Sequence, residues 1–223
     1  VRNALQFSLN IPAVKALAVI GNDPVQAKAE AMGVTFQDGQ VDAGLTFALG
    51  VEEVHVKDLV RAYGTLANRG RLVYQTTIVT VTDSAGIEVI GPATTPEPDQ
   101  VVDPGAAGIM TDILAGNTDP KVNPYWGKFK ITEGKRRRPA TLKTGTNNDA
   151  LDLSAYGYIG APSAKERTNG EYALAVAAWN GNSDNTPIST ARDPLFSIDV
   201  TTYVWQGFLQ EATDGWSING FST

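Results

Sequence analysis

Apolar and polar residues along the chain follow two periods, one typical of helices and one typical of strands. Helical spacing together with cap residues predicts helices over residues 1–7, 11–20, 23–32, 54–68, 103–116 and 196–212. β-Branched residues predict a hairpin of 72–81 with 87–90, and then three successive strands over 140–146, 153–159 and 172–179. Residues 91–99 and 117–138 have neither period and are predicted to be loops.

The order of these elements indicates the fold class. Helices, a hairpin, a helix, three strands and a last helix form an α+β arrangement, because strands and helices do not alternate regularly. The polar connection over residues 160–170 suits antiparallel neighbours in a sheet. At the second helix, Asn10 is the expected N-cap and Pro12 lies in the first turn.

Composition narrows the chemistry that the chain can perform. With 223 residues, 42% of them hydrophobic, the chain can bury a core, and its net charge of −6 argues against nucleic acid as a partner. It has no cysteine and one histidine, His55, which we expect to be a capping or surface residue. Disulfides, zinc–thiolate sites, cysteine nucleophiles and His-rich metal sites are therefore excluded, and we expect no metal or cofactor.

The most informative local motif is Lys143-Thr144-Gly145-Thr146, which lies on a predicted strand. Alternation places both threonine hydroxyls on one side, and the glycine leaves the backbone open to close approach. A cation, two hydroxyls and a bare strand edge form a receptor for a peptide that ends in a carboxylate and adds as an extra strand. The simpler alternative is a solvent-exposed strand end.

The tripeptide Ser-x-Asn occurs three times, beginning at Ser8, Ser183 and Ser217. Ser183 lies in a turn-rich stretch and Ser217 in a tail that we expect to be frayed. Ser8 lies between two predicted helices, where a hydroxyl and an amide can be held rigidly.

A basic run and a pair of nearby carboxylates are each more simply explained by structure than by chemistry. The basic run at residues 135–138 is expected to be a solvated face, although it could meet an acidic polymer or lipid head groups. Asp149 and Asp152 follow the Lys-Thr-Gly strand, and their neighbours indicate a turn rather than an acid/base pair.

Taken in order, these segments resemble the transpeptidase domain of penicillin-binding proteins of the class A, bifunctional type. The resemblance covers nearly the whole chain and is carried by residues 1–15, 46–50, 62–70, 142–149, 156–160 and 179–187. The family's motifs are Ser-x-x-Lys, Ser-x-Asn and Lys-Thr/Ser-Gly in that order, which selects Ser8-Leu9-Asn10 for the second. Ser-x-x-Lys is missing from this chain, and we expect it upstream of Val1.

The resemblance implies a fold and a set of site residues. The fold is β-lactamase/transpeptidase-like, an antiparallel sheet packed between helices, here without the N-terminal strands and the nucleophile helix. Residues 1–212 would form the C-terminal part of the domain and 213–223 a tail. Ser8 would relay a proton to the departing D-Ala nitrogen, Asn10 would bind the acyl side of the substrate, and Lys143 would hold the Ser8 hydroxyl and add positive potential.

The remaining implied roles belong to the strand. Thr144 and Thr146, with the open backbone at Gly145, would bind the terminal carboxylate, and the Thr146 N–H would donate to the oxyanion. The implied activity of the full-length protein is peptidoglycan D,D-transpeptidation through a serine acyl-enzyme, and we expect the 223-residue chain to be inactive by itself.

The implied partners are D-Ala-D-Ala stem peptides and β-lactams, together with an upstream glycosyltransferase module and membrane anchor on the outer face of the bacterial membrane. Two alternatives stay open. One is a D,D-carboxypeptidase or β-lactamase-like serine hydrolase, and the other is a non-catalytic wall-binding or scaffold protein of the same fold.

Overall fold

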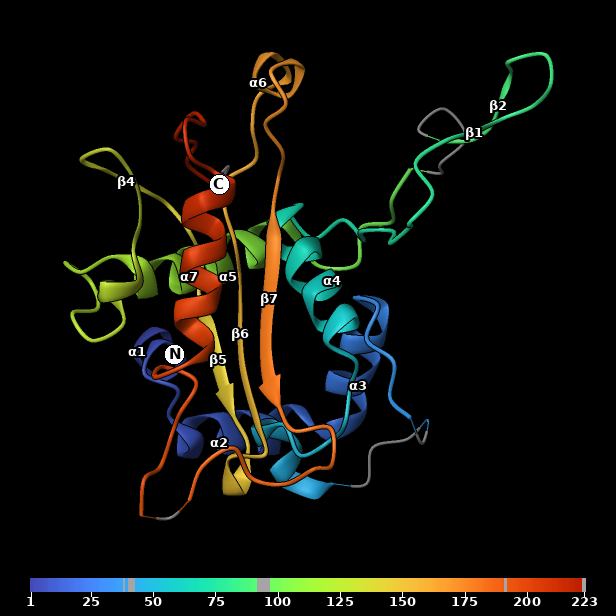
Figure 1. Ribbon diagram of the computed structural model, residues 1–223. Coiled ribbons are helices and arrows are strands. Elements are labelled where there is room, and N and C mark those ends of the chain that lie inside the picture. The colour runs from blue at the N-terminus through green and yellow to red at the C-terminus, as the bar shows by residue number, and fades with distance from the viewer. Residues whose placement is uncertain (38, 40–42, 92–96, 191, 222–223) are drawn as a thin grey trace.

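Figure 1 shows the computed structural model of the chain, which describes residues 1–37, 39, 43–91, 97–190 and 192–221. The α-helices are α1 (Arg2–Gln6), α2 (Asn10–Ile20), α3 (Asn22–Ala31), α4 (Val56–Ala67), α5 (Pro104–Ala115), α6 (Ala164–Thr168) and α7 (Thr201–Ala212). The strands are β1 (Val81–Thr82), β2 (Glu88–Ile90), β3 (Ile131–Glu133), β4 (Arg136–Arg138), β5 (Lys143–Thr146), β6 (Asp152–Tyr158) and β7 (Ala175–Gly181). Short 3-10 turns lie at Gly44–Leu49, Gly116–Thr118, Gly127–Phe129 and Asn148–Ala150.

The central sheet has the strand order β5-β6-β7, and both pairs are antiparallel. Lys143 lies opposite Tyr156, which lies opposite Ala177, so the three residues form one row across the sheet. β5 is an edge strand. The three predicted strands and their antiparallel order are confirmed.

Helices cover both faces of this sheet. On one face Tyr63 of α4 stacks on Tyr156 of β6, with ring centroids 5.3 Å apart. On the other face, Trp205 of α7 lies against Gly157, and successive strand residues point to opposite faces. The predicted α+β fold with an antiparallel sheet between helices is therefore confirmed (Figure 1).

The core fills the space between the sheet and α7. Its fully buried side chains come from α7, from β3 and β6, and from the segments that precede β3 and β5; they are Phe129, Ile131, Ala140, Leu142, Ala155, Trp205 and Leu209. Burying one of the leucine, isoleucine or phenylalanine side chains in this set stabilises the folded chain by about 1.5–3 kcal/mol. This core fixes the position of α7 relative to β5 and β6.

The hairpin before α5 differs from the prediction. The turn and the second strand lie where expected, but the first strand is only Val81–Thr82 rather than 72–81. The backbone of Val73 bonds side chains of α4 instead: its N–H lies 3.3 Å from Thr65 Oγ1, and its carbonyl accepts from Arg61 Nε at 2.6 Å. The β1–β2 hairpin projects from the body in Figure 1.

Three further element boundaries were predicted wrongly. The polar stretch 117–138 contains a second hairpin, β3 with β4, closed at Gly134 in the left-handed region (φ +56°). The last helix begins at Thr201 rather than 196. Asn10 is the first helical residue rather than the N-cap, which is Leu9.

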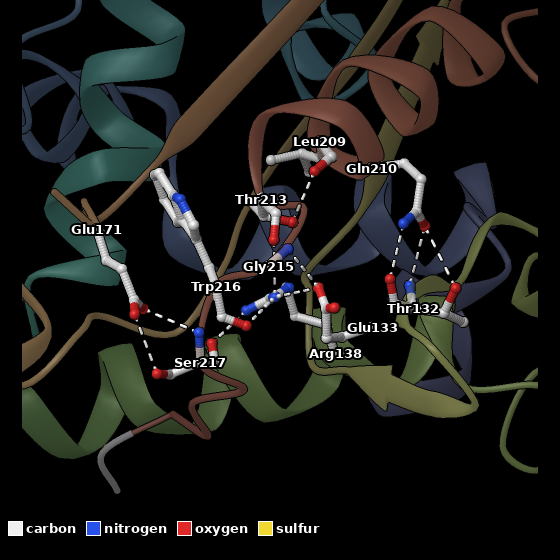
Figure 2. Close-up of polar contacts among 10 residues, drawn as sticks. All are labelled: Thr132, Glu133, Arg138, Glu171, Leu209, Gln210, Thr213, Gly215, Trp216 and Ser217. Carbon is white, nitrogen blue, oxygen red and sulfur yellow. Dashed lines mark hydrogen bonds and ion pairs between the residues drawn. The ribbon is translucent and has the colours of Figure 1, made fainter. Parts of the chain in front are cut away.

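The basic run is not uniformly solvated either. Arg138 is 2% exposed, and its guanidinium lies 3.5 Å from the Glu133 carboxylate (Figure 2). The same guanidinium donates to the carbonyls of Thr213, Trp216 and Ser217. The buried cation thus ties β4 to the segment that follows α7.

That last segment is not frayed. Ser217 donates from its N–H and its hydroxyl to the Glu171 carboxylate, both at 3.0 Å (Figure 2). The Phe221 ring packs edge-on against Tyr158. Residues 213–221 therefore pack against the body of the fold, while a domain boundary at residue 212 stays a prediction.

Candidate active site

The start of the Lys143–Thr146 strand is tied to the C-terminal end of α5. The Leu142 N–H donates to the Leu114 carbonyl at 3.3 Å, and Asn117 Nδ2 donates to the Leu142 carbonyl at 2.8 Å. These bonds occupy the outer edge of the chain up to Leu142. Beyond that point no described strand pairs with the outer edge of β5, where the Thr144 carbonyl accepts from Lys143 Nζ.

Backbone alternation shows which groups face this open edge. The N–H groups of Thr141 and Asn147 donate to Tyr158 and Asp152 in or beside β6, at 2.8 and 3.1 Å. In an antiparallel pair every second residue bonds the partner strand, so the backbone groups of Thr144 and Thr146 face away from β6. This is the geometry that an added peptide strand requires.

Ser8 reaches this strand from the connection between α1 and α2. Its backbone is in the left-handed region (φ +53°), which a non-glycine residue adopts at a cost of order 1 kcal/mol. The buried Gln6 anchors α1 by donating to the Ile113 carbonyl of α5 at 2.8 Å. The helix position and the turn together direct the serine hydroxyl toward β5.

Lys143 and Ser8 meet although 135 residues separate them in the sequence. Lys143 Nζ donates to Ser8 Oγ at 2.7 Å and to the Thr144 carbonyl at 2.8 Å. Burial lowers the pKa of Lys143 to about 8, because desolvation disfavours the ammonium. The site thus holds a hydroxyl bound to an ammonium whose pKa is about 8.

The other predicted site residues are placed differently. Thr144 is half-buried, while Gly145, Thr146 and Asn10 are exposed. Within the described part of the chain, the Asn10 side chain has no hydrogen-bond partner. The structure thus brings Ser8, Lys143 and the strand together, whereas among the described residues the Asn10 side chain makes no hydrogen bond to them.

Sequence reasoning missed one residue of this site, Ser197. Its N–H donates to Thr146 Oγ1 at 3.1 Å, and the two hydroxyl oxygens lie 2.9 Å apart. Its hydroxyl also donates to the Gly145 carbonyl. No local pattern could have indicated a contact between residues 51 positions apart.

The remaining polar candidates have structural roles or lie away from the strand. Asp152 is the first residue of β6 rather than a turn residue. Its carboxylate accepts from Asn147 Nδ2 at 2.8 Å and from Trp179 Nε1 at 2.9 Å, which gives it a structural role at the end of the sheet. His55 is exposed at the start of α4, and the side chain of Asp149 lies outside the described residues. Among the residues that the structure describes, no acidic or histidine cluster could hold a metal ion, and no helix has the length and apolarity to cross a membrane.

Proteins of similar sequence are penicillin-binding proteins. The chain is 28% identical over 213 residues to penicillin-binding protein 2D of Bacillus subtilis, covering 95% of this chain and 28% of that protein. It is 27% identical over 220 residues to penicillin-binding protein 1A of Clostridium botulinum, covering 95% and 23%. The chain therefore spans about a quarter of the length of these relatives. No protein-family model matches it.

Solved structures of penicillin-binding proteins share the fold. PonA1 of Mycobacterium tuberculosis in complex with penicillin V has a TM-score of 0.73 at 21% identity, over 100% of this chain and 58% of that one. Penicillin-binding protein 1A of Haemophilus influenzae has a TM-score of 0.75 at 18% identity, over 100% and 35%. In sequence the chain is thus a relative of the penicillin-binding proteins over nearly its whole length, and it has the fold of their transpeptidase domains.

Proposed function

We propose that the protein carrying this chain is a peptidoglycan D,D-transpeptidase that cross-links stem peptides through a serine acyl-enzyme and is acylated by β-lactams. The observation that carries the proposal is the 2.7 Å contact of Lys143 Nζ with Ser8 Oγ beside the open edge of β5. The motif order and the relatives support it, among them a PonA1 structure in complex with penicillin V.

The substrate would lie extended along β5. Main-chain groups of Thr144 and Thr146 face that edge, so a D-Ala-D-Ala terminus can add as a strand with its carboxylate near the two threonine hydroxyls. The bare backbone at Gly145 leaves room for this approach. Lys143 adds positive potential toward the carboxylate.

Acylation would use a serine from a Ser-x-x-Lys segment outside this chain. Its oxygen attacks the carbonyl between the two D-Ala residues, and the Thr146 N–H stabilises the oxyanion. The C–N bond then breaks, and Ser8 relays the proton given up by the attacking serine to the departing D-Ala nitrogen, so that its own hydroxyl is restored. An amine of a second stem peptide resolves the ester and restores the serine.

We also propose which other parts of the protein the chain works with and where it is located. It would act together with an upstream glycosyltransferase module and a membrane anchor, on the outer face of the cell membrane, and would be inactive by itself. No step in the proposed mechanism uses a metal or a cofactor.

Labelling with a fluorescent penicillin tests the proposal. In the full-length protein we expect Ser8→Ala and Lys143→Ala each to lower the rate constant of labelling about 100-fold, the order of magnitude associated with losing one transition-state contact. Ser183→Ala is the matched control, because Ser183 begins a Ser-x-Asn outside the site. Equal labelling of all variants would exclude the site, and an unlabelled wild type would favour a non-catalytic scaffold.

Product analysis separates the hydrolytic alternatives. With a D-Ala-D-Ala peptide and an amine acceptor, a transpeptidase gives the amide product. A carboxypeptidase or β-lactamase-like hydrolase gives the free acid only.

The pKa of Lys143 predicts the pH dependence of labelling. Because burial lowers this pKa to about 8, the ammonium predominates below pH 8 and is lost above it. If the cation is the active form, the labelling rate constant falls about tenfold for each pH unit once the pH is well above 8.

Lys143→Arg provides the control for this profile. A guanidinium stays charged throughout the range, so the variant should lose this decline even if its rate is low. A wild-type rate that rises through pH 8 would instead assign Lys143 the role of a neutral base.

A further inference from the structure

Ser197 lies between the last helix and the candidate active-site strand, and it is 1% exposed. Its carbonyl accepts from Thr202 at the start of α7, from the N–H at 2.9 Å and from the hydroxyl at 2.8 Å. The neighbouring Ile198 is part of the core. The backbone of Ser197 is therefore fixed to α7, leaving its N–H and hydroxyl directed at the sheet.

The hydroxyl of Ser197 contacts the backbone of two strands. It accepts from the Ser154 N–H of β6 at 3.2 Å and lies within hydrogen-bond reach of the Gly145 carbonyl of β5. A carbonyl oxygen can only accept, so in the contact with Gly145 the Ser197 hydroxyl is the donor. The neighbouring Thr146 hydroxyl, 2.9 Å away, then donates to Ser197, and the Ser154 hydroxyl is a second, longer donor to the Gly145 carbonyl at 3.4 Å. The Ser197 hydroxyl thus bridges the two strands, because it accepts from the backbone of β6 and donates to the backbone of β5.

The Gly145 carbonyl and the Thr146 N–H belong to one peptide group. Its carbonyl is on the β6 side and its N–H faces the open edge, as the alternation of β5 requires. A donor on the carbonyl polarises the peptide and makes its N–H a stronger donor. Ser197 also fixes the next side chain, because its own N–H donates to Thr146 Oγ1 at 3.1 Å.

We propose that Ser197 is a positioning residue for the oxyanion donor, acting through the Gly145–Thr146 peptide group from the side away from the substrate. This inference rests on the proposed function, which makes the Thr146 N–H that donor. Ser197 itself would not touch substrate. Its hydroxyl would hold the plane of the peptide and strengthen its N–H where charge develops during acylation.

Rapid kinetics of penicillin acylation in the full-length protein separate this role from a structural one. We expect Ser197→Ala to lower the acylation rate constant about tenfold, less than the 10²–10³-fold typical of losing a whole donor, while the Kd of the non-covalent complex changes less than twofold. A merely structural role would change both constants or neither. Ser189→Ala is the matched control, because the Ser189 hydroxyl accepts from the Leu195 N–H in the same loop without touching β5.

A second substitution covers the case in which the alanine variant fails to fold. Ser197→Cys keeps a side chain of similar size with a weaker donor, so its acylation rate should lie between those of wild type and Ser197→Ala. An unchanged acylation rate in the folded Ser197 variants would overturn the inference. If Ser8→Ala and Lys143→Ala still lose labelling in that case, the proposed function stands without it; if they label normally, the proposed function fails.

Discussion

Replacing Arg138 with methionine is expected to lower the free energy of unfolding by about 3–5 kcal/mol. The guanidinium is buried and donates to three carbonyls of residues 213–217. Methionine fills much of the volume but removes the donor to the Trp216 and Ser217 carbonyls, and an unsatisfied buried acceptor costs about 1–3 kcal/mol. The Thr213 carbonyl and the Glu133 carboxylate keep backbone donors, from Trp216 and Gly215, but Glu133 loses its nearby cation. Urea unfolding of the domain measures the loss as a lower midpoint.

Arg136→Met is the matched control for this prediction. Arg136 belongs to the same basic run and the same strand, but its side chain is exposed. A surface substitution of this kind changes stability by less than about 0.5 kcal/mol. Equal effects of the two substitutions would show that Arg138 does not hold the last segment.

Local sequence patterns correctly predicted those helices and strands that are determined by neighbouring residues, such as cap residues. The Asp103-Pro104 start of α5 is an example: the Asp103 carboxylate accepts from the Ala106 N–H at 2.9 Å, as an N-cap does. A similar signal was overlooked at Ser163 and Glu166, which form a capping box at α6 inside the predicted connection 160–170. The predicted strand 72–81 was wrong in its length: among the described residues only Val81–Thr82 pair with β2, and the backbone of Val73 bonds side chains of α4.

The candidate site depends on contacts that have no local signal. Lys143 could be singled out on its strand, but pairing it with Ser8 required the order of motifs that the resemblance supplied. Arg138 looked like its solvated neighbours, because whether a cation is buried depends on a segment about 75 residues later in the chain. Ser197 was missed for the same reason, and its contacts became visible only with α7 in place.

The position of α7 therefore connects the stability of the fold to the chemistry proposed for β5. Its first turn holds Ser197 against Gly145, and the segment after its last turn is held by Arg138. Substitutions that displace α7 should therefore change the geometry of β5 even when no residue of the candidate site is altered. At Gly157 the buried Trp205 of α7 lies directly against the sheet backbone.

Gly157→Ala is expected to destabilise the domain by about 3 kcal/mol, the upper end of the typical cost of overpacking and severe for a single added methyl group. A Cβ at this position would lie 1.9 Å from the Thr141 carbonyl oxygen and 2.8 Å from Trp205 Cζ2 of α7. Neither group can move without displacing a strand or the buried indole. The same change at Gly207, where a Cβ would meet no described atom within 4 Å, should instead stabilise α7 by about 0.5–1 kcal/mol. In thermal unfolding, 3 kcal/mol corresponds to a decrease in Tm of about 6–12 °C; a Gly157→Ala protein as stable as the Gly207→Ala protein would contradict this packing of helix and sheet.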